Sequence, residues 1–346
     1  MSSIQSRINA FVALGNFLGQ FSSRKIEKSS TVLFNELFFD GFIHQIKLAE
    51  EQNSWFTKEA ILFSIENWAN ALTHKNLTQW ISNENIIEKP SKTVAIIMAG
   101  NIPLVGFHDF LSVLLCGHSV LVKQSSNDKH LIPYLSKYLE YVEQDFKEKI
   151  SFTDKKIKDF DAVIATGSTN TTRYFEYYFK NKPNIIRRNR NSVAIITGEE
   201  TKEDIENLSE DIFRYFGLGC RSVSKLFVPK NYDFNKFFEG MYTYRNIINN
   251  TKYANNYDYN KAVYLMSEFS ILENGFLMIK EDTNFASPIA TVFSYIVLKT
   301  RQTNLPNRKY SNHISMILAS KIFGLASTPA FTRALALSTA SSCNSY

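Results

Sequence analysis

From Ser91 onward the sequence alternates between short β-branched runs and segments with helical spacing, and this alternation restricts the fold more than any other feature. Three runs predict buried strands, at residues 94–98, 119–123 and 161–165, and helices are expected between them, at residues 104–116 and 130–147. A strand, helix, strand, helix, strand order produces a parallel sheet with helices on its faces. The fold class is therefore α/β.

A second α/β segment follows the first. Its predicted elements are a strand at residues 193–196, a helix from Lys202 to Gly217 and a strand at residues 224–229. Residues 1–90 are predicted to be mostly helical, with aromatic-rich amphipathic segments at 32–39 and 59–68 whose rings we assign to the core. A chain of 346 residues fits two domains. We divide it into a helical region (1–90), a first α/β domain (91–188), a second α/β domain (189–331) and a Ser/Ala-rich tail (332–346).

The net charge of +6 does not indicate a nucleic-acid-binding surface. All 33 acidic residues lie at or before Asp282, whereas six of the 39 Lys and Arg residues follow it, so the positive excess belongs to the last part of the chain. The N-terminal residues lack the apolar core of a signal peptide, and no run approaches the ~20 apolar residues of a membrane span. Three scattered cysteines and six histidines lack metal-binding or disulfide spacing. We expect a cytoplasmic protein with no metal site.

Three predicted turns follow the strands of the first α/β segment, at the sheet edge where such folds bind ligands. Asn101 follows the first strand, and its amide is either a donor to a ligand or a helix N-cap. Lys123 ends the second strand, with Ser125 two residues later, and either holds an anion or hydroxyl group or is an ordinary surface lysine. Gly167 and Ser168 follow the third strand, where a helix N-terminus suits a phosphate, although Ser168 also fits a simple helix cap.

Cys220 lies in the segment Phe216-Gly-Leu-Gly-Cys-Arg-Ser-Val-Ser224, between a predicted helix and a predicted strand. The two glycines before it permit unusual backbone geometry and close approach of a ligand. Arg221 beside it favours the thiolate over the thiol. A free cysteine is more often an inert packed group, and Cys116, in an apolar helix, fits that description.

A compact cationic turn is predicted at residues 185–190, which contain Arg187, Arg188 and Arg190. The three guanidinium groups either form a solvated loop or clamp the phosphate of a substrate.

In their order along the chain, these residues resemble the aldehyde dehydrogenase superfamily, and most closely its LuxC-type fatty acyl-CoA reductase branch. Gly100-Asn-Ile-Pro-Leu104 and Gly117-His-Ser-Val-Leu-Val-Lys-Gln-Ser125 are similar to the Asn-Phe-Pro helix and the Gly-x-x-Val-x-Lys-Pro strand of the superfamily. Ala165-Thr-Gly-Ser-Thr169 is similar to its Thr-Gly-Ser cofactor turn, and Gly217-Leu-Gly-Cys-Arg-Ser222 to its Gly-Gln-x-Cys nucleophile loop. The resemblance covers residues 90–295. It implies an aldehyde dehydrogenase-like fold, with a Rossmann-type cofactor domain and a second α/β catalytic domain.

The resemblance also implies the role of each site residue. Cys220 matches the nucleophile, Asn101 the oxyanion donor and Lys123 the residue that holds the cofactor ribose. Ser125, Gly167 and Ser168 complete the implied cofactor site. NADPH is the implied cofactor, with NADH not decided against, and a long-chain acyl-CoA or acyl-carrier protein is the implied acyl donor.

Arg187 marks a departure from the superfamily. Dehydrogenases carry, at the matching position, the glutamate that activates the hydrolytic water. An acyl-enzyme without such a base is expected to survive until it meets a hydride, which favours a reductase over an aldehyde-oxidising enzyme.

The expected activity is therefore NADPH-dependent reduction of a long-chain acyl thioester to a fatty aldehyde through an acyl-Cys220 intermediate. Two alternatives stay open: a non-catalytic module that binds a nucleotide or acyl thioester, and an acyl transferase or thioesterase that uses Cys220 without reduction. A homo-oligomer is compatible with the sequence, which does not decide the oligomeric state. Residues 322–331 still resemble the family, but the acid-free tail at 332–346 departs from it.

Overall fold

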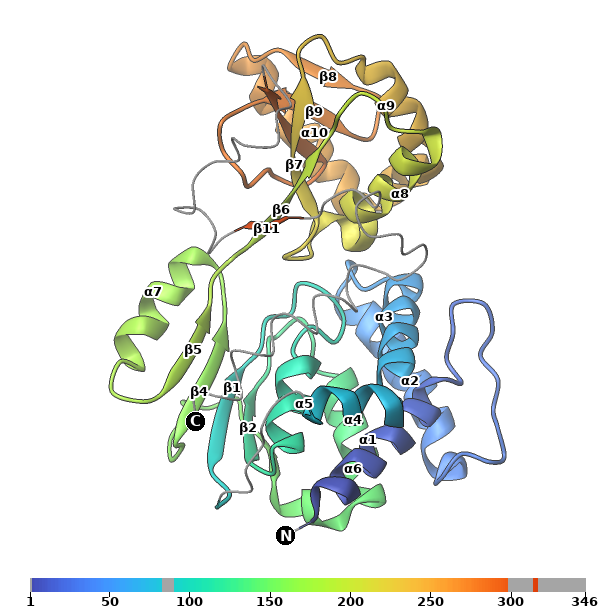
Figure 1. Ribbon diagram of the computed structural model, residues 1–346, viewed down its shortest axis with the longest axis vertical. Coiled ribbons are helices and arrows are strands. Elements are labelled where there is room, and N and C mark those ends of the chain that lie inside the picture. Colours follow the sequence, from blue (N-terminus) through green and yellow to red (C-terminus); the bar gives the residue numbers. More distant parts are fainter. Residues whose placement is uncertain (1, 83–89, 298–313, 317–346) are drawn as a thin grey trace. The chain divides into compact units, whose positions relative to one another are not determined.

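The computed structural model describes residues 2–82, 90–297 and 314–316. The predicted features at residues 322–331 and 332–346, and Cys343 with them, lie outside the described residues. The chain divides into two compact units, one running to Arg188 and the other beginning at Asn189. Each unit has its own sheet (Figure 1).

Four helices precede the first sheet: α1 (Ile4–Leu18), α2 (Asn35–Gln52), α3 (Lys58–Ala71) and α4 (His74–Ser82). Ser3 and Thr57 cap α1 and α3 by accepting hydrogen bonds from amides of the first turn. The rings of Phe17 and Tyr138 stack with their centroids 4.5 Å apart in the core that these helices share with the sheet. The predicted helical, aromatic-rich N-terminal region is confirmed, although α2 begins at Asn35 rather than at residue 32.

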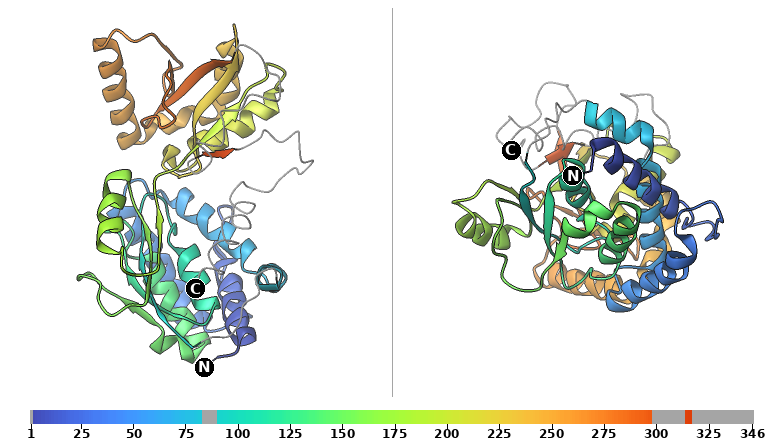
Figure 2. Two further views of the ribbon diagram at one scale, coloured as in Figure 1. Left: turned by 60° about the vertical axis from the view of Figure 1, so that its left-hand side comes forward. Right: turned by 90° about the horizontal axis from the view of Figure 1, so that it is seen from below.

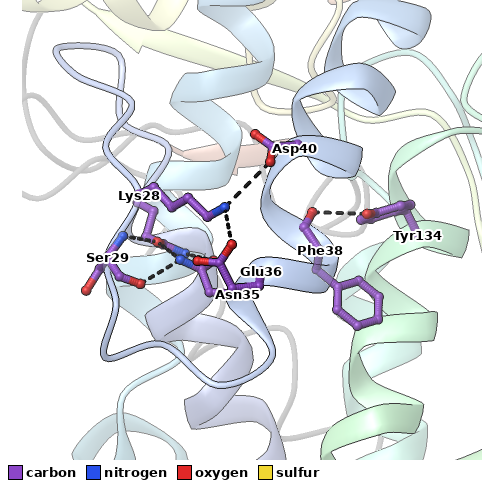
Figure 3. A network of polar contacts seen from close by, with 8 residues as sticks. Lys28, Ser29, Asn35, Glu36, Phe38, Asp40 and Tyr134 are labelled. Atoms are coloured by element: carbon purple, nitrogen blue, oxygen red, sulfur yellow. Dashed lines mark hydrogen bonds and ion pairs between the residues drawn. The ribbon is translucent and has the colours of Figure 1, made fainter.

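The segment between α1 and α2 is held by a polar network (Figure 3). Asn35 is buried and exchanges two side-chain hydrogen bonds with Gln20, at 2.8 and 2.9 Å, while it also donates to the carbonyl of Ser29. Lys28 pairs with Glu36 of α2 at 2.8 Å. Since buried amides are costly unless hydrogen-bonded, this network fixes how the segment joins α2.

The first sheet contains five parallel strands in the order β3-β2-β1-β4-β5. Their bounds are β1 (Thr93–Ile97), β2 (Ser119–Lys123), β3 (Ile150–Phe152), β4 (Ala162–Thr166) and β5 (Asn184–Arg187). The connecting helices are α5 (Phe107–Leu115), α6 (Leu131–Val142) with the 3₁₀ turn η1 (Gln144–Glu148), and α7 (Thr169–Tyr178).

Both faces of this sheet are covered, as a parallel sheet requires. Ile96 and Ile164 belong to the core shared with α1, α5 and α6, whereas Ala95 and Val163 pack with Phe175 of α7. Figures 1 and 2 show α7 across β4 and β5 from α1 and α6. The α/β class and the strands predicted around β1, β2 and β4 are confirmed.

Two strands of the first sheet were not predicted. β3 has three residues and comes directly after the helical segment, so its pattern is too short to recognise. β5 replaces the predicted cationic turn at 185–190: residues 184–187 are a strand, paired with β4. The prediction was wrong because arginines dominate this segment, while Ile185 and Ile186 supply the strand pattern. The first predicted helix was also too long, because α5 begins at Phe107 rather than at 104.

The second unit is built on a six-stranded sheet in the order β11-β6-β7-β10-β9-β8, in which β8 alone is antiparallel to its neighbour. The strands are β6 (Asn191–Ile195), β7 (Val223–Pro229), β8 (Ile271–Glu273), β9 (Met278–Glu281), β10 (Thr291–Val297) and β11 (Ile314–Met316). Helices α8 (Lys202–Phe213) and α9 (Phe234–Met241) pack on one face, and the 3₁₀ turn η3 (Tyr242–Asn249) leads to α10 (Thr251–Met266). No helix in the described ranges is long and apolar enough to span a bilayer.

Candidate active site

The order of strands in the first sheet reverses beside β1. From β1 the chain proceeds to β2 and β3 on one side, and then to β4 and β5 on the other (Figure 1). Open α/β sheets bind ligands outside the carboxyl ends of the strands at such a switch point. Because β2, β1 and β4 are adjacent and parallel, the turns that follow them meet at one edge of the sheet. These are the three turns that carry the predicted residues.

The turn after β1 packs against the turn after β2. A Cβ atom on Gly100 would lie 2.5 Å from Oγ of Ser125, so only glycine fits at this position. Asn101 is not a helix N-cap, because α5 begins six residues later with Gly106 at its cap position. The simpler of the two predicted roles for Asn101 is therefore excluded, and the donor role stays a prediction.

Lys123 ends β2 as predicted, and its side chain is half-buried. Its Nζ donates to the carbonyl of Lys155 at 3.2 Å. An ammonium group binds a neutral carbonyl more weakly than it binds an anion, so the contact with Lys155 can be exchanged for another partner. The predicted ribose-binding role of Lys123 stays a prediction.

Asp128, which was not predicted, joins the first two turns. Its Oδ2 accepts a hydrogen bond from the backbone amide of Leu104 at 3.3 Å, and its own amide donates to the carbonyl of Ser125 at 3.2 Å. The residue is only 5% exposed, and burial raises the pKa of Asp128 to about 7, more than the Leu104 hydrogen bond lowers it. No sequence signal could have found it, because an aspartate in a polar run after a strand is ordinarily exposed.

The turn after β4 begins a helix. Ser168 is the N-cap of α7 and accepts a hydrogen bond from the amide of Thr171 at 3.3 Å, which confirms the capping role. A Cβ on Gly167 would lie 3.0 Å from the ring of Phe175, so a side chain here would have to displace that ring. The cap is exposed and lies at the positive end of a ten-residue helix, an arrangement suited to a phosphate.

Two of the three predicted phosphate-binding arginines pair with carboxylates of the protein. Arg187, at the end of β5, forms an ion pair with Asp109 of α5, and Arg188 forms one with Glu176 of α7. The Asp109 side chain is 7% exposed. Burial would raise the pKa of Asp109, but the charge of Arg187 and the hydrogen bond and charge of His108 outweigh it, so that this pKa lies below its usual value. Arg190 is exposed and has no ion pair within the part of the chain that the structure describes.

Cys220 is exposed at the tip of a tight turn in the second unit. The amide of Ser222 donates to the carbonyl of Gly219 at 3.0 Å, so Cys220 and Arg221 occupy the two central positions of this β-turn. The sulfur therefore belongs to a presented side chain, not to the inert buried class. Cys116, by comparison, is half-buried at the end of α5.

The backbone before this turn is left-handed over three residues. Tyr215, Phe216 and Gly217 have φ values of 54°, 59° and 74°. Helix α8 accordingly ends at Phe213, short of the predicted end at Gly217, and the 3₁₀ turn η2 (Arg214–Gly217) follows. Left-handed backbone costs a non-glycine residue about 1–2 kcal/mol, so surrounding contacts must hold Tyr215 and Phe216 in place.

Solved structures define the class of fold. The chain is similar to aldehyde dehydrogenase 21 from Physcomitrella patens in complex with succinate, with 11% identity, a TM-score of 0.62 and coverage of 86% of this chain and 69% of that one. A Mycobacterium tuberculosis aldehyde dehydrogenase complexed with NAD+ has 12% identity and a TM-score of 0.60, and the match covers 86% of this chain and 69% of that one. The Pseudomonas syringae indole-3-acetaldehyde dehydrogenase AldA has 12% identity and a TM-score of 0.59, and the match covers 86% of this chain and 68% of that one. The fold is therefore that of the aldehyde dehydrogenases, as expected.

The family follows from the sequence itself. Residues 43–241 match the model of the acyl-CoA reductase (LuxC) family, and the chain belongs to that family. Membership places it among oxidoreductases that act on acyl or aldehyde groups. A comparison with curated proteins gives no match.

Proposed function

We propose that this protein reduces a long-chain acyl thioester to the aldehyde at the expense of NADPH, through an acyl group carried on Cys220. The observation that carries the proposal is the exposed position of Cys220 at the centre of a β-turn, in a chain of the acyl-CoA reductase family. The donor is acyl-CoA or acyl-carrier protein, and the proposed setting is the cytoplasm.

The first unit fits a nicotinamide dinucleotide. The Gly167–Ser168 turn offers an exposed helix N-terminus for a phosphate, and the Gly100–Ser125 contact lets two turns approach each other without intervening side-chain bulk. Lys123 and Ser125 supply donors for a ribose at the same sheet edge. When bound, the reduced cofactor supplies a hydride, the chemistry that amino-acid side chains lack.

The proposed reaction assigns two further tasks to the chain. The thiolate of Cys220 attacks the thioester carbonyl, a new C–S bond forms, and the old C–S bond breaks as the donor leaves as a thiolate, which takes its proton from water. The Asn101 amide and the Cys220 backbone amide donate to the oxyanion that develops on the carbonyl oxygen. After hydride addition to the acyl carbon, the tetrahedral group on Cys220 collapses to free aldehyde and regenerated thiolate.

Arg187 supports reduction over hydrolysis. The resemblance places the water-activating glutamate at this position, and here the side chain is a cation already paired with Asp109. A guanidinium does not accept a proton from water at neutral pH, so the acyl group lacks this route to hydrolysis.

An acyl-trapping experiment tests the proposal. The protein is incubated with hexadecanoyl-CoA and its intact mass is measured with and without NADPH. We expect an acyl adduct that Cys220→Ala abolishes and the matched control Cys116→Ala retains, and that NADPH discharges with loss of its absorbance and appearance of aldehyde. Absence of any adduct refutes the covalent mechanism. An adduct that NADPH does not discharge indicates an acyl transferase instead.

A further inference from the structure

Asp128 contacts the turn that carries Asn101 at both of its ends. At one end, the carboxyl oxygen Oδ2 of Asp128 accepts a hydrogen bond from the backbone amide of Leu104 at 3.3 Å. At the other end, the amide of Asp128 donates to the carbonyl of Ser125 at 3.2 Å, and Ser125 is the residue against which Gly100 packs. Asn101 lies between Gly100 and Leu104 in the sequence, so a single residue of the second turn restrains the backbone on either side of it.

Leu104 has an unfavourable backbone conformation. Its φ is 58°, in the left-handed region that residues with a β-carbon rarely adopt. Three contacts hold it there: its side chain is buried in the core, Ser64 of α3 donates to the carbonyl of the preceding residue, Pro103, at 3.0 Å, and Asp128 accepts from its amide. Strained residues persist only where their surroundings hold them, and they cluster at functional sites. The carboxyl of Asp128 therefore opposes relaxation of the turn.

The turn that carries Asp128 is itself fixed to helix α2. The side chain of Gln52, the last residue of α2, donates to the carbonyl of Ser126 at 2.8 Å. The next side chain, that of Asn53, donates to the carbonyl of Asn127 at 3.4 Å. Asp128 is therefore anchored to the helical part of the first unit, and it can restrain the neighbouring turn.

The carboxyl of Asp128 makes no other hydrogen bond within the described part of the chain. Its second oxygen, Oδ1, is buried and has no partner there, so the Leu104 amide is the one donor to this side chain. The contact with Ser125 belongs to the backbone of Asp128 and does not depend on the side chain. A substitution at Asp128 therefore removes the restraint on Leu104 and leaves the other polar contacts of its turn in place.

We propose that Asp128 is a positioning residue for the acylation of Cys220, because its carboxyl holds the turn from which Asn101 donates to the oxyanion. The inference rests on the proposed function, which gives Asn101 that task. Asp128 acts through Asn101 and not on the substrate. A donor stabilises the oxyanion only from a well-defined position, so a turn that relaxes at Leu104 loses part of this stabilisation. The loss falls on the rate of acylation rather than on binding of the thioester.

Two substitutions separate the hydrogen bond of Asp128 from the shape of its side chain. Asp128→Asn keeps an oxygen that can accept from the Leu104 amide, whereas Asp128→Leu keeps the branched shape and has no acceptor. Tyr138→Phe is the matched control. It removes the hydrogen bond from the hydroxyl of a buried tyrosine to the carbonyl of Leu33 at 3.0 Å, in the same unit but outside the three turns.

The measurement is the single-turnover rate of Cys220 acylation, followed by intact mass over a range of hexadecanoyl-CoA concentrations. We expect Asp128→Leu to lower the saturating rate about 10- to 100-fold and to leave the half-saturating concentration within a few-fold of its wild-type value. This loss is smaller than the ~100–1,000-fold cost of removing an oxyanion donor, because Ser64 still holds the turn. Asp128→Asn should stay within a few-fold of the wild-type rate, and Tyr138→Phe should match it.

A double variant tests whether Asp128 acts through Asn101. In an Asn101→Ala background, Asp128→Leu should slow acylation no further, because the donor that it positions has been removed. Unfolding midpoints show which variants are folded, and Asp128→Ala takes the place of Asp128→Leu if the larger leucine side chain prevents folding.

Three results in folded variants overturn the inference and leave the proposed covalent mechanism intact: a wild-type rate in Asp128→Leu; the same slowing by Asp128→Leu with and without Asn101→Ala; and equal slowing by Asp128→Asn and Asp128→Leu. A wild-type rate in Asn101→Ala refutes the oxyanion role of Asn101 and the inference with it. If hexadecanoyl-CoA does not acylate the wild type, the proposed function itself fails.

Discussion

The ion pair between Arg187 and Asp109 determines how the role of Arg187 can be tested. The direct experiment, Arg187→Glu, would place a second carboxylate beside Asp109, whose side chain is 7% exposed. Removing one partner of a buried pair costs about 3–5 kcal/mol, and the repulsion of two carboxylates adds to that cost. Since domains are stable by only ~5–15 kcal/mol, we expect this variant to lose its fold before its chemistry can be assessed.

A double-mutant cycle measures the pair. We predict that Arg187→Gln lowers the unfolding midpoint by roughly 10 °C, because the buried Asp109 is left with only its contact to His108 at 3.3 Å. Arg187→Gln/Asp109→Asn should recover part of this loss, with a coupling free energy of about 2 kcal/mol. The assay is thermal unfolding followed by circular dichroism. If the double variant is as unstable as the sum of the single variants, the two side chains do not stabilise each other and the reasoning is wrong.

The pH dependence gives an independent check on the same pair. The pKa of Asp109 is lower in the folded protein than its ordinary value of 3.8. The stability from the pair is therefore present above pH 3.8 and is lost as the pH falls through the lowered pKa. The difference in stability between wild type and Arg187→Gln should shrink in strong acid. A difference that is constant down to pH 2 contradicts an electrostatic origin.

Whether the absence of the glutamate slows hydrolysis can therefore be tested only in a variant that also removes the charge of Asp109. Arg187→Glu/Asp109→Asn removes the clash and leaves a carboxylate at the position of the water-activating base. We expect faster hydrolysis of the acyl adduct on Cys220 than in the Arg187→Gln/Asp109→Asn control, measured as loss of adduct mass without NADPH. Equal hydrolysis rates in the two folded variants would show that the absence of the base is not what separates this chain from the aldehyde-oxidising dehydrogenases.

Three further predictions concern the turns of the first unit. Asp128→Asn should raise stability most above pH 7, by on the order of 4 kcal/mol, because the buried carboxyl keeps its proton to about pH 7 while the unfolded chain releases it near 3.8. Urea unfolding at pH 5 and pH 8 measures this gain, and a gain that is larger at pH 5 than at pH 8 contradicts the prediction. Ser168→Ala and Thr201→Ala each remove a helix N-cap and should each cost about 1 kcal/mol, but only Ser168→Ala, at the proposed cofactor turn, should weaken NADPH binding measured by titration calorimetry. Gly100→Ala should destabilise the first unit because its Cβ would meet Oγ and Cβ of Ser125 at 2.5 and 2.6 Å, and Gly100→Ala/Ser125→Gly should restore the unfolding midpoint; no rescue would mean that the two turns are not in contact.

The elements with a strong local pattern were predictable, and those that depend on distant partners were not. β1, β2 and β7 have five to seven residues and are rich in Val, Ile and Leu, so their local sequence already indicates a strand. β3 and β5 are strands only because the ladder of β2 or β4 is available to pair with them. Arg187 ends β5 and Arg188 follows it directly, and these two arginines masked the short apolar pattern of this edge strand.

For the candidate site, the residue types and their order were predictable, but their contacts were not. Gly100 and Ser125 were noted separately, and only the structure shows that one must be glycine because of the other. Asp109 and Asp128 were missed because burial of a carboxylate arises from tertiary packing and leaves no mark in the local sequence. Asn101 likewise lies outside the helix, because α5 begins only at Phe107, after the cap residue Gly106.

The left-handed backbone at Tyr215 and Phe216 sets a lower limit on what the ring of Phe216 contributes. Glycine at this position would relax the backbone by about 1–2 kcal/mol, yet the chain carries a bulky aromatic whose ring lies near Tyr253. The contacts of the ring must therefore stabilise the folded state by more than the about 1–2 kcal/mol that glycine would recover. In a saturation library, residue 216 should therefore tolerate fewer replacements than its partial exposure suggests, because most substitutions lose the ring and keep the unfavourable handedness.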